Sequence, residues 1–194
     1  MKLCVIGGAG ARSAFLTKSL VKSARDIRVD HIVLLDNDQQ KLKTYGEISR
    51  ELSRRLDPDL TFEVTSDARA ALTGVDYIIT TIRAGEDAGR LFDEQTCLAH
   101  GVLGQETTGA GGFAMAIRSV PTLVYYCTLA REVANPGHLI FNFTNPSGII
   151  TQALRSKGFD NVYGICDAPS GFIKQLEEIL EIPYGTLDIE CYGL

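Results

Sequence analysis

The residues best suited to chemistry follow the first expected strand, Lys2–Ile6. Gly7, Gly8 and Gly10 come directly after it and precede an amphipathic segment. A strand that runs into glycines and then a helix presents main-chain N–H groups to a phosphate, and glycine lets a pyrophosphate approach closely. The match to G-x-G-x-x-G is partial, because Ser13 stands where the third glycine would be. A tight structural turn is the alternative.

Asp36 indicates which dinucleotide the glycine turn would bind. It ends the second expected strand, His31–Leu35. An acid at this place accepts hydrogen bonds from the 2′-OH of an adenosine ribose and repels a 2′-phosphate, so it favours NAD over NADP. The alternative is a helix N-cap ahead of the next helix.

Charged residues follow the fourth expected strand, residues 75–82. Arg83 and Arg90 lie in or beside the next loop. Ligands of open α/β sheets bind beyond the carboxyl ends of the strands, where arginine grips an anion with two parallel hydrogen bonds. The alternative is a solvated arginine paired with Asp93 or Glu94.

Asn145 follows the fifth expected strand, residues 138–142, and precedes Pro146. The X-Pro step keeps Asn145 extended and is expected to point its amide into the cleft, where it can bind sugar hydroxyls as donor and acceptor. An asparagine turn before a helix is the alternative.

Cys166 and Asp167 follow the sixth expected strand, residues 161–165. A thiolate at the mouth of a sheet can bind a divalent metal or act as a nucleophile, and Asp167 can be a ligand or a general acid. The alternative is a small buried residue, as free cysteines usually are. The five cysteines are odd in number and contain no C-x-x-C, so we expect no disulfide framework.

Strands and helices must alternate to position these residues. Apolar runs and helical periodicities alternate along the chain, which predicts an α/β fold: a doubly wound, mainly parallel Rossmann-like sheet with helices on both faces. The third strand is expected at residues 60–65. The expected helices span residues 11–24, 42–56, 88–101, 113–134, 147–157 and 169–180.

Composition excludes several other classes. The chain has 194 residues, 45% of them hydrophobic and 22% charged, with a formal net charge of −5 at pH 7. Enough apolar residues are present for a core, so a disordered chain is excluded. The acidic balance gives no reason to expect nucleic acid or an anionic membrane as partner. No apolar run approaches the ~18 to 20 residues that span a bilayer, and no signal peptide is evident, so a cytoplasmic location is expected.

Several segments together resemble one family, the NAD- and divalent-metal-dependent glycosidases of glycoside hydrolase family 4, in particular its 6-phospho-β-glucosidases. The matching segments occur in the family's order and cover essentially the whole chain. They are Val5–Gly8, Ile82–Gly85, Gly89-Arg90, Asp93-Glu94, Gly101–Arg118 (GVLGQETTGAGGFAMAIR), Asn142–Gly148, Gly164–Cys166 and Tyr192–Leu194.

The resemblance implies hydrolysis of O-glycosidic bonds by transient oxidation at C3 of the sugar, loss of the C2 proton, elimination of the aglycone and addition of water. It implies tightly held NAD, a divalent metal, most plausibly Mn²⁺, and a phosphorylated sugar glycoside as substrate. This family is an exception to the two-carboxylate scheme of most glycosidases. A homo-oligomer is also expected in the full-length protein.

The resemblance also implies roles for single residues. Cys166 would bind the metal, Asn145 would hold the sugar hydroxyls, and Arg83 and Arg90 would face the substrate and its 6-phosphate. Glu106 would sit near nicotinamide and sugar, and Asp167 resembles a leaving-group acid. The dinucleotide site would comprise Gly7, Gly8, Gly10, Arg12, Ser13 and Asp36.

This sequence departs from the family's usual pattern in three places, and each affects the expected function. The family's Ser/Tyr/Thr-Pro-Glu stretch after the glycines is replaced here, so Arg12 or Ser13 would supply the lost contacts. The GQETTG segment favours β-glycosides and the Cys166-Asp167 pair favours α, which leaves the anomer open. The family's metal-binding histidine follows the segment that ends this chain.

These departures predict an NAD-binding domain at residues 1–183 and, at residues 184–194, the first strand of a C-terminal α+β domain before which the chain is truncated. We expect such a fragment to bind NAD and to cleave nothing. The alternatives are an NAD-dependent 2-hydroxy acid dehydrogenase of the malate or lactate type and a non-catalytic NAD-sensing module.

Overall fold

Alternating side chains along β1 (Lys2–Ile6) face two different layers. Cys4 and Ile6 belong to one buried cluster, whereas Leu3 and Val5 belong to the other. Successive side chains of a strand point to opposite faces, so a strand that is apolar at both must be covered on both sides. β1 is therefore a central strand.

All strand pairs are parallel, and their order across the sheet is β3-β2-β1-β4-β5-β6. The order reverses between β1 and β4, which is where ligands of doubly wound sheets bind. The expected doubly wound α/β sheet is confirmed. Its other strands are β2 (His31–Leu35), β3 (Thr61–Thr65), β4 (Tyr77–Thr80), β5 (Leu139–Asn142) and β6 (Val162–Gly164).

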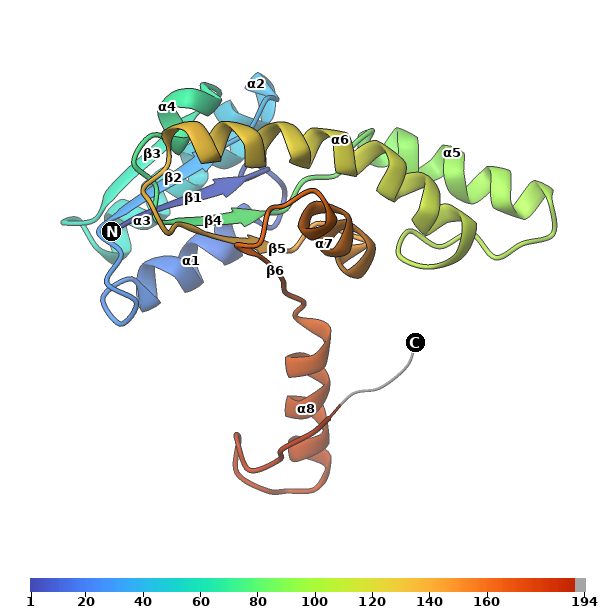
Figure 1. Cartoon of the computed structure of the whole chain (residues 1–194). Coiled ribbons are helices and arrows are strands. Elements are labelled where there is room, and N and C mark those ends of the chain that lie inside the picture. Colours follow the sequence, from blue (N-terminus) through green and yellow to red (C-terminus); the bar gives the residue numbers. More distant parts are fainter. Residues whose placement is uncertain (191–194) are drawn as a thin grey trace. The chain divides into compact units, whose positions relative to one another are not determined.

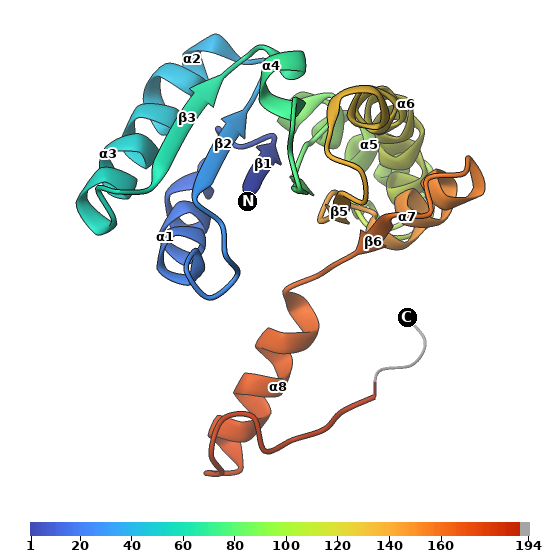
Figure 2. The ribbon, with the colours of Figure 1, turned by 60° about the vertical axis from the view of Figure 1, so that its left-hand side comes forward.

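Helices cover both faces of the sheet. Helix α1 packs on one face with α3 beside it, and α4, α6 and α7 cover the other, as Figure 1 shows for α1 and α6 and Figure 2 for α1 and α3. The helices are α1 (Ser13–Ser23), α2 (Gln39–Lys41), α3 (Glu47–Leu56), α4 (Ala68–Leu72), α5 (Glu86–Ala99), α6 (Gly109–Val133), α7 (Ser147–Ser156) and α8 (Ala168–Ile179).

The second expected helix differs in detail from the sequence prediction. It begins at α2, continues through a π-helical turn η1 (Leu42–Gly46) and ends with α3. A Cβ at Gly46 would lie 2.6 Å from Cγ1 of Val64, so this turn needs glycine to approach β3. The short helix α4 was not expected, and the Asp67 side chain caps it by accepting a hydrogen bond from the N–H of Ala70 at 3.0 Å.

Helix α6 starts earlier than expected, inside the glycine-rich segment. A Cβ at Gly111 would lie 2.5 Å from the Gln105 carbonyl oxygen. By length and composition, α6 is apolar enough to cross a membrane. Its residues Leu123 and Cys127 are buried in the core above the sheet, and core helices meet the same criterion.

The structure is a computed structural model that describes residues 1–190, and Cys191 and the Tyr192–Leu194 match lie outside that range. The described residues form two compact units, one from Met1 to Gly164 and one that begins at Ile165. Leu187–Glu190 has no regular secondary structure. The strand expected at residues 184–194 would need a partner strand for its hydrogen bonds. The domain boundary expected at residue 184 stays a prediction.

Candidate functional site: a glycine turn joined to the end of β2

The turn after β1 is hydrogen-bonded to the end of β2 and packs closely against the chain after β4. The N–H groups of Gly7 and Gly8 both donate to the carbonyl oxygen of Leu35, at 2.8 and 3.0 Å. Gly7 has a φ of +82°, and a Cβ there would lie 2.8 Å from the carbonyl oxygen of Thr81. Both the left-handed backbone and the close approach of the chain after β4 require glycine at this position.

Gly10 is in a different environment. A Cβ there would meet no atom of the described residues within 4 Å, so no contact with them explains this glycine. In the part of the chain that the structure describes, the N–H groups of Gly10, Ala11 and Arg12 donate no hydrogen bond. They precede the N-terminus of α1, where main-chain donors and the helix dipole favour an anion.

Arg12 and Ser13, both expected near the dinucleotide, differ in exposure. Arg12 is exposed. The side chain of Ser13 is buried, and its hydroxyl lies 3.4 Å from the hydroxyl of Ser49 on α3. The Ser13 side chain thus fills the contact between α1 and α3.

Asp36 uses both carboxylate oxygens to organise the turn. Oδ2 accepts a hydrogen bond from the N–H of Ala9 at 3.1 Å, and Oδ1 accepts one from the N–H of Asp38 at 3.1 Å. Asp36 is not the cap of the following helix, because Asp38 accepts hydrogen bonds from the N–H groups of Gln40 and Lys41. Each carboxylate oxygen has a second lone pair, so Asp36 can still accept from a ribose hydroxyl.

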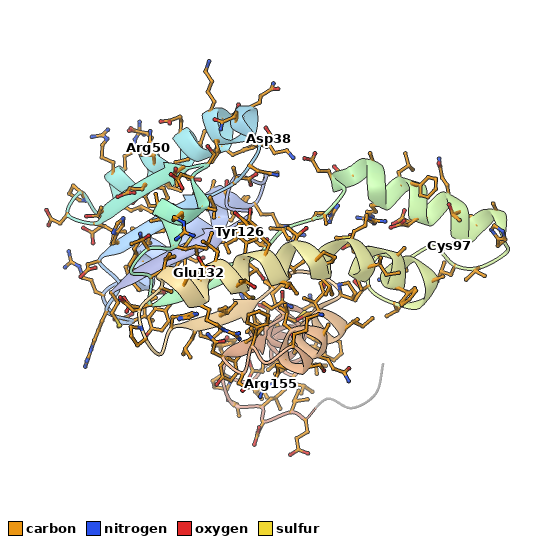
Figure 3. The ribbon with its side chains drawn as sticks, turned by 45° about the horizontal axis from the view of Figure 1, so that its top comes forward. Asp38, Arg50, Cys97, Tyr126, Glu132 and Arg155 are labelled. Atoms are coloured by element: carbon orange, nitrogen blue, oxygen red, sulfur yellow. The ribbon has the colours of Figure 1, made fainter. Side chains whose placement is uncertain are left out.

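Tyr126 of α6 adds a phenol near this carboxylate. Burial raises the pKa of Tyr126, and the nearby Tyr125, Asp36 and Cys4 raise it further. Figure 3 shows Tyr126 on the face of the sheet that α6 covers. No sequence pattern distinguishes this position, because Tyr126 lies within the periodic pattern of α6.

A buried polar network joins the ends of β4 and β5. The side chain of Asn142 is fully buried, and its Oδ1 accepts hydrogen bonds from the hydroxyl of Thr80 at 2.9 Å and the N–H of Thr144 at 3.3 Å. Its amide nitrogen donates to the carbonyl oxygens of Thr144 and Ser147 and to the hydroxyl of Thr151. The network fixes the loop that carries Asn145.

The sequence patterns did not predict Thr80, Asn142 or Thr144 as site residues. A polar residue at the end of an otherwise apolar strand is the signal that points to such positions. The hydroxyl of Thr144 also accepts a hydrogen bond from the N–H of Ile82 at 3.1 Å, which ties the two loops together. Asn145 is only partly buried, and its side chain makes no hydrogen bond in the described structure, so its amide is free to bind a ligand.

Arg83, Arg90 and Glu106 come together from separate segments. Oε2 of Glu106 lies 3.1 Å from Nη2 of Arg83 and 3.6 Å from Nη1 of Arg90. It is buried and makes these contacts as ion pairs without an aligned hydrogen bond. Arg83 also pairs with Asp87, and Arg90 with Glu94 at 2.7 Å, one of the two partners considered for it.

The other considered partner, Asp93, holds a different arginine. Its carboxylate makes a two-pronged ion pair with Arg118 of α6, and Nε of Arg118 donates to the carbonyl oxygen of Ala84 at 3.2 Å. This pair with the Asp93 carboxylate raises the pKa of Arg118. It joins α5, α6 and the loop that begins at Arg83.

Cys166 and Asp167 belong to the second unit, where the Cys166 side chain is exposed. Asp167 immediately precedes α8, and its carbonyl oxygen accepts hydrogen bonds from Ser170 and Gly171. Among residues 1–190, no three His, Cys, Asp or Glu side chains gather as a metal-binding group. The described residues alone therefore do not make a complete metal site.

The strand order, the glycine turn after β1 and the acid at the end of β2 define this chain as a doubly wound α/β protein of the dinucleotide-binding type. The chain belongs to the family 4 glycosyl hydrolases, whose family profile matches residues 2–182. The resemblance noted from the sequence is thus confirmed.

Relatives of known activity support that assignment. The chain is 34% identical to the 6-phospho-beta-glucosidase BglT of Thermotoga maritima over 100% of its own length and 46% of that protein. It is 32% identical to the phospho-alpha-glucosidase PagL of Clostridium acetobutylicum, over 99% of this chain and 44% of that one. The chain therefore spans less than half the length of the curated relatives it matches.

Solved structures agree with the fold. A 6-phospho-alpha-glucosidase from gut microorganisms, in complex with NAD and Mn²⁺, superposes with a TM-score of 0.90 at 31% identity, over 96% of this chain and 44% of that one. Malate dehydrogenase from Naegleria fowleri superposes with a TM-score of 0.67 at 13% identity, over 94% of this chain and 52% of that one, which shows a shared fold alone.

Proposed function

We propose that this chain is the NAD-binding portion of a 6-phospho-glucosidase that hydrolyses O-glycosidic bonds of phosphorylated sugars. One observation carries the proposal: in a family 4 chain, the glycine turn is hydrogen-bonded to the acid at the end of β2. Relatives were solved with NAD, Mn²⁺ and glucose-6-phosphate.

The residues of the turn fit NAD. Among the described residues, the N–H groups from Gly10 to Arg12 donate no hydrogen bond, and a Cβ at Gly10 would meet nothing within 4 Å, as a turn that binds a pyrophosphate requires. Asp36 would accept the ribose hydroxyls of NAD. Arg12 is exposed beside this turn and would contact the pyrophosphate, while Ser13 would act by packing α1 against α3.

Bound NAD would supply reversible hydride removal at C3 of the sugar. Asn145, with its free amide, would hold the sugar hydroxyls as donor and acceptor. Arg83 and Arg90 would bind the 6-phosphate, and Glu106 between them would orient the two guanidinium groups beside the sugar. Asp167 would donate a proton to the leaving aglycone.

For the metal, we propose Cys166 as one ligand in the complete protein. The remaining ligands would come from residues outside the described set, since residues 1–190 contain no cluster of three metal-binding side chains. No catalytic step is assigned to a metal held by this chain alone. We also propose a cytoplasmic, homo-oligomeric protein without nucleic-acid or membrane partners, with a second domain that begins near residue 184.

Calorimetric titration with NAD⁺ tests the cofactor assignment. We expect the chain to bind NAD⁺ more tightly than NADP⁺, and Asp36→Ala to weaken NAD⁺ binding at least about tenfold and to narrow that margin. Asp26→Ala, at an exposed carboxylate away from the turn, is the matched control. Equal NAD⁺ affinities for the unaltered chain and Asp36→Ala would remove Asp36 from the site.

Release of p-nitrophenol from a p-nitrophenyl 6-phosphoglucoside, with NAD⁺ and Mn²⁺, tests the reaction. The 194-residue chain is expected to release none, and release is expected once the portion that completes the relatives' length is supplied. No NADH absorbance should accumulate, because the hydride returns. Steady accumulation of NADH with a 2-hydroxy acid would instead support a dehydrogenase.

A further inference from the structure

An ion pair crosses the carboxyl edge of the sheet above the glycine turn. Nζ of Lys41 in α2 lies 3.0 Å from Oε2 of Glu86, the first residue of α5. α2 follows β2 and α5 follows β4, and these two strands are separated by β1. A contact between the segments after β2 and β4 therefore spans the crevice above the end of β1.

Lys41 is held from both sides. Its ammonium also lies 3.4 Å from Oδ2 of Asp38, whose own N–H donates to Asp36. Figure 3 shows Asp38 at the start of α2, on the side toward the beginning of α5. The hydrogen bond to Glu86 raises the pKa of Lys41, in spite of the opposing effect of its slight burial.

The backbone at Glu86 supports a specific placement. Gly85 and Glu86 have φ values of +83° and +53°. A left-handed conformation is unfavourable for glutamate and persists where the surrounding contacts over-determine it. Here the ion pair with Lys41 and the hydrogen bond from the N–H of Glu86 to the carbonyl oxygen of Arg83 hold it.

The charges around Lys41 disfavour the 2′-phosphate of NADP⁺. Asp36, Asp38 and Glu86 supply three negative charges against the one positive charge of Lys41. Asp36 lies beside the place where the adenosine ribose would bind. A 2′-phosphate there would meet a net negative charge, and the nearby ammonium is already committed to two carboxylates.

We propose that Glu86 is a specificity-determining residue, which discriminates against NADP⁺ by withdrawing Lys41 from the ribose 2′ position. The inference rests on the proposed NAD site. Asp36 repels the 2′-phosphate directly. Glu86 acts indirectly, because its ion pair with Lys41 keeps the ammonium from binding the 2′-phosphate. Without Glu86, the lysine can turn toward the ribose and pair with a phosphate.

Titrations of NAD⁺ and NADP⁺ against Glu86→Gln test this. We expect the affinity for NADP⁺ to rise about three- to tenfold, since one charge near a phosphate dianion is removed and one ammonium is released, while the affinity for NAD⁺ stays within about twofold. The gain should shrink in high salt, because exposed charges are screened.

Double variants identify the lysine. Lys41→Met in the Glu86→Gln background should abolish the gain, whereas Lys43→Met should keep it. Lys43 is an exposed lysine in the same helical segment, so the change of net charge is matched. An unchanged NADP⁺ affinity in Glu86→Gln, or a gain that survives Lys41→Met, would overturn the inference while the NAD site stands. Absence of NAD⁺ binding by the unaltered chain would overturn the proposed function and this inference together.

Discussion

The carboxylate of Asp36 and the main-chain N–H of Ala9 are joined by a 3.1 Å hydrogen bond, although 27 positions separate them in the chain. The bond fixes the glycine turn after β1 to the end of β2. The acid that we propose as the ribose ligand therefore also shapes the loop that we propose binds the pyrophosphate. Such preorganisation lowers the entropy lost when a ligand binds.

Two glycines of the turn should respond differently to alanine. Gly7→Ala should lower the free energy of unfolding by about 1–3 kcal/mol or more, because its φ is positive and its Cβ would collide with the Thr81 carbonyl oxygen. Gly10→Ala should change it by less than about 0.5 kcal/mol but weaken NAD⁺ binding at least about tenfold. Urea unfolding and calorimetry measure the two quantities, and undiminished NAD⁺ binding by Gly10→Ala would contradict a pyrophosphate at this glycine.

Asn142 at the end of β5 and Asn145 in the loop that follows offer a second contrast. Asn142→Ala should destabilise the protein by about 2–4 kcal/mol, because it leaves buried groups of Thr80 and Thr144 without their partner. Asn145→Ala should change stability by less than about 0.5 kcal/mol, since its side chain makes no hydrogen bond to any residue in the range 1–190. Thermal unfolding distinguishes them, and similar losses for both variants would refute the assignment of Asn142 as the anchor of the loop.

The exposed cysteine should react with a thiol reagent faster than the buried ones. Burial raises the pKa of both Cys4 and Cys127 to about 12, so neither supplies a thiolate at neutral pH, whereas Cys166 is exposed. In a Cys191→Ser background, we expect a thiol reagent to modify Cys166 quickly and Cys4 and Cys127 only after unfolding. Peptide mass mapping reads the sites, and Cys166→Ser should remove the fast phase.

Acid should weaken the second unit through Glu177. Its carboxylate is covered and accepts a hydrogen bond from the N–H of Leu187 at 3.0 Å; this bond and the nearby main-chain N–H groups of Gly185 and Thr186 lower the pKa of Glu177. A lowered folded-state pKa contributes stability that is present above the unfolded value of about 4.5 and is lost as the pH falls through the folded value. Hydrogen exchange of the Leu187 amide should therefore accelerate in that acidic window, beyond the intrinsic rate change, in the unaltered chain. Glu177→Gln should abolish this pH dependence, and an unchanged profile would exclude Glu177 as its source.

Local patterns in the sequence predicted most of the fold. Apolar runs located β1, β2 and β5 within a residue, because buried parallel strands are almost continuously hydrophobic. The short helix α4 escaped notice, since five residues are too few for a helical period. The π-helical turn also escaped, because it depends on the approach of Gly46 to Val64 on another element.

The candidate site was predictable where single residues end strands. Asp36 and Asn145 stood out for that reason, and so did the glycines. The network around Asn142 and the pair of Lys41 with Glu86 were not foreseen, because both depend on contacts between segments separated by 45 to 62 positions. Only the packed fold brings such partners together.

The central place of β1 also affects when the turn can form. β1 pairs with β2 on one side and with β4, at Tyr77–Thr80, on the other. Gly7 must fit against the carbonyl of Thr81, which follows β4 and is therefore made later than the turn itself. On the ribosome, the glycine turn therefore acquires its shape only after β4 has emerged, and β1 and β2 remain only partly paired until then.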